Sequence, residues 1–270
     1  MGDIQIRFAE PGDAEQIASL FASSFCQDRA DLLIYGCRGA SEYIRMQLEC
    51  LIPSRESTYF VAEKPGDGVI AAVELRRRSN GLLLNYIAVR AHHRKQHLGG
   101  MLFSAAVAMS GMSSGQIALD VFHDNVLASQ WYSRLGFQTS ASTEFVELAP
   151  PCEADDGLAY VSGLPQADLC QERFGFSQFN FITRKGTFPV GRIGDTWFRL
   201  TDLAAVGSSA IFAALDLLDT GRRIFAVVPA SSVPPAQVVR VLAKTHRMEA
   251  NIPHLMSLLS DDYQKSRELA

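Results

Sequence analysis

The chain has 270 residues, enough for one large domain or for two domains of ordinary size. Hydrophobic residues make up 47% of the chain and charged residues 20%, which is typical of a soluble globular protein and excludes extensive disorder. The net charge of −4 gives no sign of a general nucleic-acid-binding surface, so no nucleic-acid partner is expected.

The cysteine pattern and the lack of long apolar stretches indicate in which cellular compartment the protein is expected. None of the five cysteines forms a Cys-x-x-Cys pair, so neither a zinc site nor a disulfide framework is expected. The adjacent His92 and His93 raise a metal alternative, but neighbouring side chains on an extended turn point apart and no third ligand is evident. No stretch approaches the ~18 apolar residues of a membrane span, and the start shows no signal segment. We therefore expect a cytoplasmic protein with free thiols, no metal and no membrane partner.

The first part of the chain predicts a series of strands and helices. An alternating strand at 4–8 precedes a turn in which Asp13 is placed to cap a helix. Apolar residues at helical spacing predict that helix through Phe25, and a second helix over 41–51. Strands at 58–63 and 69–75 flank the turn at 64–68 and predict a β-hairpin. A turn at 79–81 then leads into an apolar strand at 82–89, which we expect to be buried on both faces.

A basic loop with two glycines follows this strand and leads into a helix. The stretch from Arg94 to Phe103, RKQHLGGMLF, places two cations and the pair Gly99 and Gly100 before apolar residues at helical spacing. The first N–H groups of a helix lack internal partners and carry partial positive charge, so they suit phosphate oxygens. Glycine lets a diphosphate approach the backbone closely. The alternative interpretation is a tight turn with a basic, solvated rim.

Three further elements complete the first half. The pattern predicts a strand at 116–122, a helix over 124–136 that starts with Asp and Asn and stops at glycine, and a strand at 143–148. The polar, proline-bearing segment 149–157 then marks a boundary. We therefore expect one domain at 1–150 and a second at 151–270.

Two motifs of this first half, in this order, resemble the GNAT superfamily of acyl-CoA-dependent N-acyltransferases. Val89, Arg94, His97 and Gly99 fall on the family's phosphate-loop pattern, although His97 stands where the family usually has glycine. The family's later pattern is matched by Asn125, Ala128, Tyr132, Leu135, Gly136 and Phe137. The resemblance covers roughly residues 1–150 and implies an α/β fold with a mixed, mostly antiparallel twisted sheet flanked by helices.

By resemblance, acetyl-CoA is the expected co-substrate. Its pantetheine arm would lie between the fourth and fifth strands, here 82–89 and 116–122, and would pair with the backbone of Ile87 and Val89. An N–H near Val89 would polarise the thioester carbonyl. The expected coenzyme-binding residues are Ile87, Val89, Arg94, Lys95, Gln96, His97, Leu98, Gly99, Gly100, Asn125 and Tyr132.

The resemblance also implies direct attack of an amine on the thioester, with Tyr132 as the acid that protonates the leaving thiolate. The alternative for Tyr132 is an aromatic side chain packed in the core beside Trp131. No carboxylate lies on the strand 82–89, where many relatives have the general base. Asp120, Glu74 or His123, directly or through water, are the candidates, and each is equally well explained as an ordinary polar neighbour.

Residues beyond 157 predict strands at 179–186 and 196–203, a helix over 208–221, a strand at 222–229, a helix over 234–251 and a strand at 253–259. This order looks like the back part of a GNAT fold and suggests a degenerate second copy without its own catalytic centre. An unrelated α/β appendage is the alternative. The second unit is expected to cover the first sheet, to shape the acceptor pocket or to form a subunit interface in a homodimer.

The functional prediction is an acyl-CoA-dependent N-acetyltransferase that acts on a primary amine, with a small-molecule acceptor favoured over a protein amine. The rival is an acyl-CoA-binding sensor or scaffold with weak or no turnover. His97 and the missing strand carboxylate favour the rival, whereas Tyr132 and Asn125 oppose it.

Overall fold

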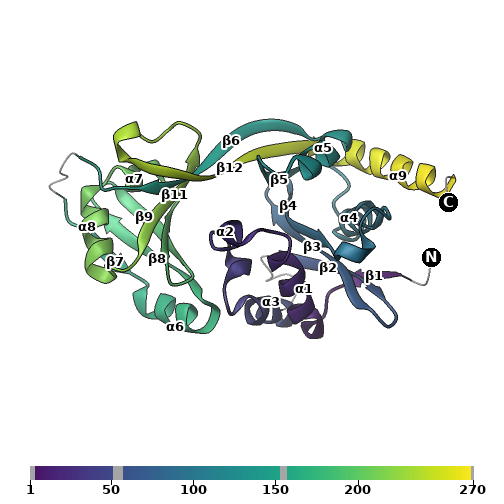
Figure 1. Ribbon diagram of the computed structural model, residues 1–270, viewed down its shortest axis with the longest axis horizontal. Helices are drawn as coiled ribbons and strands as arrows, with labels where there is room; N and C mark the ends of the chain where they lie inside the picture. The colour runs from purple at the N-terminus through teal and green to yellow at the C-terminus, as the bar shows by residue number, and fades with distance from the viewer. Residues whose placement is uncertain (1–3, 51–56, 153–156, 269–270) are drawn as a thin grey trace. The chain divides into compact units, whose positions relative to one another are not determined.

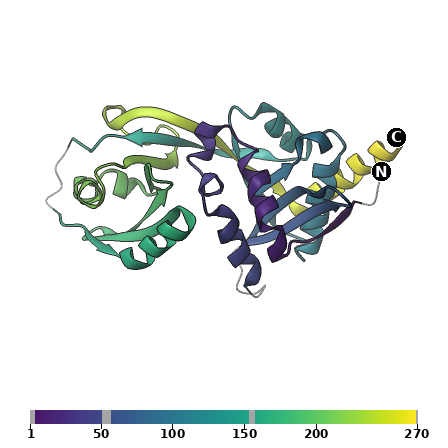
Figure 2. The ribbon, with the colours of Figure 1, turned by 60° about the horizontal axis from the view of Figure 1, so that its bottom comes forward.

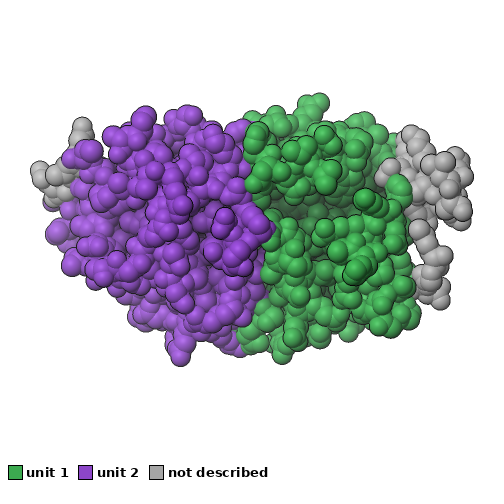
Figure 3. All heavy atoms as spheres, in the orientation of Figure 1, with its two compact units in different colours: residues 1–25, 41–140, 246–270 green, residues 26–40, 141–245 purple. Residues whose placement is uncertain are grey.

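The computed structural model describes residues 4–50, 57–152 and 157–268. Contacts divide the chain into two compact units, drawn in green and purple in Figure 3. Unit 1 comprises Met1–Phe25, Ser41–Ser140 and His246–Ala270, and unit 2 comprises Cys26–Ala40 and Ala141–Thr245. This division differs from the expected single boundary near residue 150, because an early segment packs with the second half and the end of the chain packs with the first.

Unit 1 is built around the predicted hairpin and the apolar strand that follows it (Figure 1). Its elements are β1(Gln5–Phe8), η1(Pro11–Asp13), α1(Ala14–Ala22), α3(Ala40–Glu49), β2(Ser57–Lys64), β3(Gly68–Arg78), β4(Gly81–Val89), η4(Ala91–His93), α4(Leu98–Met109), β5(Gln116–Phe122), α5(Val126–Arg134) and α9(Ile252–Glu268). The predicted strands and helices up to residue 136 are confirmed, and Leu51, expected to end the second helix, lies outside the described residues.

The strands of unit 1 follow the order β1-β2-β3-β4-β5-β12-β6, where β12(Val238–Asn251) and β6(Gln138–Leu148) each contribute part of their length. Neighbours from β1 to β4 pair antiparallel, and β4 pairs parallel with β5. Alternate side chains point to opposite faces of the sheet. One face packs on α1, where Phe21 contacts Tyr86, and the other packs on α4, where Leu102 joins the core cluster of Val73 (Figures 1 and 2). The predicted mostly antiparallel sheet between helices is therefore confirmed.

Unit 2 repeats this strand order. Its sheet runs β7-β8-β9-β10-β11-β6-β12, and its only parallel pair among the described strands of known register, β10 with β11, takes the place that β4 with β5 holds in unit 1. The elements are α2(Gln27–Ala30), η2(Ile34–Gly36), β7(Tyr160–Ser162), α6(Leu164–Phe174), β8(Phe176–Thr183), β9(Gly186–Ile193), β10(Trp197–Leu200), α7(Leu203–Val206), α8(Ser209–Leu218), β11(Arg223–Pro229) and η5(Pro235–Gln237). The helix predicted over 208–221 is observed as α8, and the strands predicted at 179–186, 196–203 and 222–229 overlap β8, β10 and β11.

The end of the chain was predicted wrongly. Residues 238–251, expected as a helix, form the long strand β12, and residues 253–259, expected as a strand, belong to the helix α9. The β-branched Val238, Val239 and Val241 favour the strand over the helix-forming residues among them. Pro253 fits the first turn of a helix, and Ile252, Leu255 and Leu259 are buried at helical spacing.

Both long strands serve both units. β6 starts in unit 1 and ends in unit 2, and β12 starts in unit 2 and ends in unit 1. The last part of β12 brings Met248 and Ala250 into the core of unit 1. No helix in the described residues is long and apolar enough to cross a membrane.

Candidate active site

Strands β4 and β5 pair over only part of their length. The parallel register runs from Gly81 with Gln116 to Leu84 with Leu119, whereas β4 continues to Val89 and β5 to Phe122. Residues 85–89 therefore have no β5 partner in the described register. The pairing therefore ends between the two strands that, by the resemblance, would flank the pantetheine arm.

A polar cluster marks the point of separation. Asn85 interrupts the pairing of β3 with β4, because Glu74 opposes Tyr86 while Leu75 opposes Leu84. Its amide nitrogen donates to Glu74 Oε2 at 2.8 Å. The other carboxylate oxygen accepts from Arg76 Nε at 2.9 Å and from the hydroxyl of Ser57. Glu74 is 0% exposed, so this ionic cluster fixes a bulge inside the sheet.

The basic loop leads into a helix whose start no side chain caps. Lys95 and His97 adopt left-handed backbone angles, with φ of 62° and 58°, and His97 occupies the position before α4 without a side-chain hydrogen bond to the helix. A left-handed residue favours glycine, which explains why a related loop would carry glycine there. The backbone N–H of Met101 donates to the His97 carbonyl at 3.0 Å. The N–H groups before Met101 precede this first helical bond and form the open end of the helix.

Arg94 and Gly99 lie at this open end. Arg94 Nε donates to the carbonyl of Val89 at 3.0 Å, which holds the guanidinium at the end of β4. A Cβ atom on Gly99 would lie 3.6 Å from Val89 Cγ2 and 3.9 Å from the ring of Trp131, which is ordinary contact. The protein's own packing therefore does not demand glycine at position 99. Gln96 Nε2 donates within the loop, to the His92 carbonyl at 3.3 Å.

Tyr132 lies on α5 among aromatic side chains, as the packing alternative predicted. It is 7% exposed, and its ring centroid is 5.0 Å from that of Trp131 and 5.6 Å from that of Phe137. Burial raises the pKa of the Tyr132 phenol above its ordinary value, so the hydroxyl keeps its proton. Asn125 caps the same helix, since its Oδ1 accepts from the backbone N–H of Ala128 at 3.2 Å.

The three candidate bases already have partners. Glu74 is held as described above. Asp120 on β5 forms a two-point ion pair with Arg247 of β12, with both distances at 2.7 Å. His123 Nδ1 lies 2.8 Å from His246 Nε2. Of the two carboxylates, Asp120 is the one with solvent access, since 41% of its side chain is exposed.

Sequence reasoning missed Asn85, Arg247 and His246. An asparagine in the middle of the apolar strand LLLNYIAV was a visible signal for Asn85. Arg247 and His246 carried none, because their neighbours on β5 lie far away in the sequence and the segment was expected to be a helix. His93 Nε2 lies 3.4 Å from Asp67 Oδ2, and within the described residues no group of three potential metal ligands gathers.

The corresponding places of unit 2 are built differently. Helix α8, which follows the parallel strand β10, starts with Ser208, whose buried hydroxyl accepts from the N–H of Ile211 at 3.4 Å. Its start is therefore closed by its own side chain. In the described residues between β11 and β12 there is only the short η5, where unit 1 has α5 between β5 and β6. No counterpart of the helix that carries Tyr132 is present there.

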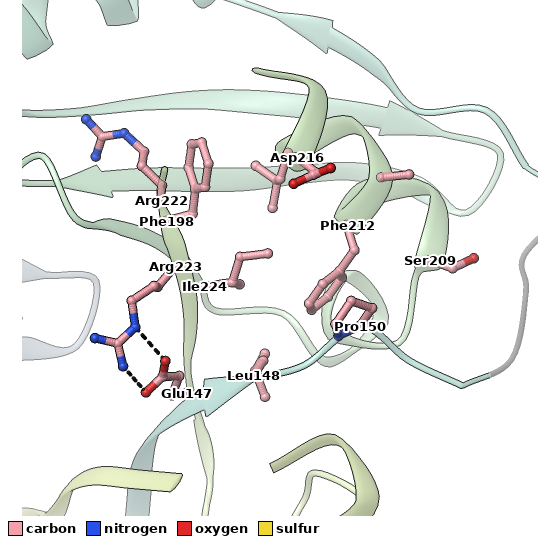
Figure 4. Close-up of a pocket in the computed structure, with 12 residues that line it drawn as sticks. Glu147, Leu148, Pro150, Phe198, Ser209, Phe212, Asp216, Arg222, Arg223 and Ile224 are labelled. Atoms are coloured by element: carbon pink, nitrogen blue, oxygen red, sulfur yellow. Dashed lines mark hydrogen bonds and ion pairs between the residues drawn. The ribbon is translucent and has the colours of Figure 1, made fainter. Parts of the chain in front are cut away.

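Unit 2 does contain a pocket of about 490 Å³ beside α8 (Figure 4). Its wall is mainly apolar, with Phe198, Phe212 and Leu148. At one edge Arg223 donates to both oxygens of Glu147 and stacks over the ring of Trp197 at 4.4 Å. Burial opposes ionisation of Glu147, but bonds from Arg223 and Arg240 outweigh it and lower the pKa of the carboxyl. These charged groups already neutralise one another.

Comparisons with known proteins find a family model that matches part of the first unit. Residues 55–139 match the model of the acetyltransferase (GNAT) domain. No curated protein matches the sequence significantly. Three solved structures share the fold over 92% of this chain: a GCN5-related N-acetyltransferase from Sphaerobacter thermophilus (15% identity, 96% of that chain, TM-score 0.61), and candidate acetyltransferases from Pyrococcus horikoshii (15%, 89%, 0.61) and Thermoplasma acidophilum (14%, 99%, 0.54).

Proposed function

Because this chain contains a GNAT acetyltransferase domain, we propose that it transfers the acetyl group of acetyl-CoA to a primary amine of a small molecule. One observation carries the proposal: β4 and β5 separate after Leu84 and Leu119, directly beside the uncapped start of α4. Free strand edges suit the amides of pantetheine, and an open helix start with two cations suits a diphosphate.

The coenzyme would be held mainly by backbone groups. The N–H groups at the start of α4, from Leu98 to Gly100, would donate to the diphosphate, and Arg94, Lys95, Gln96 and His97 would surround it. Ile87 and Val89 offer the edge of β4 to the pantetheine amides. Asn125 keeps its amide N–H₂ free for the same arm while its oxygen caps α5.

The transfer then needs one acid and one proton acceptor. The amine nitrogen attacks the thioester carbon, an N–H near Val89 stabilises the oxyanion, and the C–S bond breaks as the C–N bond forms. A thiolate with a pKa near that of cysteine, about 8.5, can take a proton from Tyr132, whose raised pKa keeps it protonated. The phenolate formed recovers its proton from solvent after the product leaves.

Asp120 is the better candidate for the amine's proton. Its carboxylate is partly exposed, and a water molecule can link it to the attacking nitrogen even while Arg247 holds it. Glu74 has the opposite properties, since it is fully buried and both its oxygens accept hydrogen bonds. We assign Glu74 a positioning part: it keeps Asn85 in the bulge where the strands separate.

Titration calorimetry with acetyl-CoA tests this proposal. We expect binding to the wild type and about tenfold weaker binding to Arg94→Ala, because a charge-assisted contact contributes about 1.5 kcal/mol. Arg134→Ala is the matched control, since Arg134 is exposed in the last turn of α5 and should leave the affinity unchanged. Equal affinities for the two variants would remove the loop from the phosphate site.

His97 favours a second candidate function, an acyl-CoA sensor. A side chain stands at this left-handed position, where the resembling family usually has glycine, and this departure suits a protein that binds acyl-CoA with weak or no turnover. Release of free thiol from acetyl-CoA in the presence of a panel of primary amines distinguishes the two functions. Tight binding with no thiol release would establish the sensor, and no binding at all would contradict both.

We assign no second centre to unit 2 and treat it as a degenerate copy of unit 1. The shared strand order and the shared position of the parallel pair support the repeat. The capped start of α8 and the short η5 support the loss of the coenzyme site.

A further inference from the structure

Unit 2 contains a cavity that the proposed function does not use, the pocket of about 490 Å³ beside α8 (Figure 4). All of its lining residues belong to unit 2. Its floor is a row of apolar side chains across three strands. Phe198 of β10 pairs with Ile224 of β11, and the pairing of Phe225 with Glu147 places Leu148 of β6 beside Ile224. Opposite residues of paired strands share a face of the sheet, so these three side chains form one surface.

Helix α8 forms the opposite wall of the pocket. The lining residues Ser209, Phe212, Ala213 and Asp216 are three or four positions apart, so they lie on one side of this helix (Figure 4). Phe212 is buried, with 4% of its surface exposed, whereas Asp216 is exposed. The pocket therefore has an aromatic interior and a carboxylate at its mouth.

A difference between the two units explains why the fold leaves this space open. In unit 1, β12 is the neighbour of β5 and leads into α9, whose Ile252 and Leu255 join the core with Leu102 of α4. In unit 2, β6 is the neighbour of β11 in the same way, but the described residues between β6 and β7 form no helix. Leu148 and Pro150, at the end of β6, line the pocket instead. A helix of its own covers this end of the core in unit 1, and none does so in the described part of unit 2.

The charges around the pocket leave one carboxylate unbalanced. Both arginines of the lining have carboxylate partners, since Arg222 Nε donates to Asp219 Oδ2 at 2.9 Å and Arg223 donates to both oxygens of Glu147. Asp216 has neither an ion pair nor a hydrogen bond to its side chain in the described part of the chain. A carboxylate beside apolar walls attracts a cation and repels an anion.

We propose that this pocket binds an organic cation with an apolar body, such as an ammonium ion that carries an aryl or alkyl chain. The apolar body lies between Phe212 and the row of Phe198 and Ile224, and the ammonium group lies at Asp216. Cavities of about 300–1,000 Å³ with mainly apolar walls and a few polar groups are typical of small-molecule sites. The face of the Phe212 ring gives a cation a further attraction. The site lies wholly within unit 2 and needs no coenzyme.

Three probes with the same phenylbutyl chain test the charge preference, one carrying a trimethylammonium group, one a hydroxyl and one a carboxylate. Their affinities are measured by ligand-observed NMR titration without acetyl-CoA, so the result does not depend on the proposed function. We expect the ammonium probe to bind the wild type about fivefold more tightly than the alcohol, the upper range for an exposed ion pair. The carboxylate probe should bind most weakly of the three.

Asp216→Asn removes the charge and keeps the size of the side chain. We expect the ammonium probe to bind this variant about fivefold more weakly than the wild type, while the affinity for the alcohol stays the same. Glu172→Gln is the matched control, because Glu172 is an exposed carboxylate on α6 that does not line the pocket. It should leave all three affinities unchanged.

Ala213→Trp tests the place of binding. Ala213 lines the pocket and is exposed, so a large side chain there can fill the hollow without displacing the core. We expect all three probes to bind this variant at least about tenfold more weakly, because the apolar walls are then covered. Leu217→Trp is the matched control, since Leu217 lies on α8 outside the pocket lining with 88% of its surface exposed, and binding should persist.

Three results would overturn the proposal. They are equal affinities of the wild type for the three probes, unchanged binding in Ala213→Trp, and no binding of the ammonium probe at millimolar concentration. None of them touches the proposed function of unit 1, which the titration with acetyl-CoA tests separately.

Discussion

Tyr132 lies in the core, as the packing alternative predicted, and its role as an acid remains a prediction. Its ring is part of the core, and its hydroxyl has a pKa raised by burial. For Tyr132→Phe we expect turnover to fall about 100-fold or more, because a general acid contributes about that factor, with little change in the affinity for acetyl-CoA. Steady-state thiol release and calorimetry measure the two quantities.

The pH profile sharpens this prediction. Because the folded-state pKa of Tyr132 lies above the ordinary value of about 10, loss of its proton should not reduce the rate of the wild type below that pH. Turnover that is equal in the wild type and in Tyr132→Phe would remove Tyr132 from the mechanism.

His97 holds a left-handed conformation that costs a residue with a Cβ about 1–2 kcal/mol. In His97→Gly we expect the free energy of unfolding to change by less than about 1 kcal/mol, since relief of strain is offset by the greater entropy of the unfolded chain. Acetyl-CoA should bind several-fold more tightly to this variant, because a side chain no longer stands at this left-handed position before α4. Urea unfolding and calorimetry provide the measurements.

His97→Ala is the control for the imidazole, because it keeps the Cβ and the strain. We expect it to improve binding less than glycine does. Weaker binding in both variants would mean that the imidazole itself contacts the diphosphate, contrary to the prediction.

At the scale of elements, the ionic cluster of Glu74, Arg76 and Asn85 decides how β4 is shaped. Glu74→Gln keeps the size of the side chain but removes the negative charge to which Arg76 donates. We expect the free energy of unfolding to fall by about 1–3 kcal/mol, the range for a buried hydrogen bond to a charged group. Turnover should fall in parallel with the loss of structure at the bulge, by less than about tenfold.

Urea unfolding and steady-state kinetics distinguish a positioning role of Glu74 from a role as the general base. A variant with unchanged stability and turnover reduced about 100-fold would make Glu74 the general base. That result would contradict the positioning part assigned to it. Ser57→Ala removes a neutral partner of the same carboxylate and should have a smaller effect on stability.

The elements that local patterns define could be predicted from the sequence. Helix α4, strand β5 and helix α5 all have local caps, glycine stops or apolar periodicity, and their positions agree with the prediction to within two residues. Strand β12 could not be found in this way. Its burial depends on partners more than a hundred residues away, such as Asp120 for Arg247, and its Ala, Lys, Arg and Glu residues individually favour helix.

The site shows the same limit. The basic loop that starts at Arg94 and the residue Tyr132 lie in contiguous motifs, so their positions were visible in the sequence. The partners that occupy Asp120, His123 and Glu74 were not, because hydrogen bonds between distant strands leave no local pattern. The sequence alone therefore does not distinguish a carboxylate that is free to accept a proton from one that is held by an ion pair or hydrogen bonds.

At the scale of the molecule, unit 1 is incomplete without the end of the chain. Met248, Ile252, Leu255 and Leu259 are buried in its core. Burial of each large apolar side chain contributes about 1.5–3 kcal/mol, so their loss is comparable with the whole stability of a domain. We expect a fragment of residues 1–150 to show no cooperative thermal transition by circular dichroism.

A fragment in which residues 1–140 are joined to 246–270 by a flexible linker is the matched control and should regain a cooperative transition. Cooperative melting of the 1–150 fragment alone would contradict this interdependence. The full chain should unfold in one transition, because β6 and β12 cannot leave one sheet without disturbing the other.

The two strands that serve both units also restrict how such a chain can change over generations. A second copy with its own complete sheet could be deleted once its site was lost, and the first copy would continue to fold. Here deletion would remove parts of β6 and β12, which continue the sheet of unit 1. The second unit is therefore free to change at the start of α8, which Ser208 caps, but it has to keep its strands. In this arrangement the second unit is retained as a requirement of the first unit's architecture.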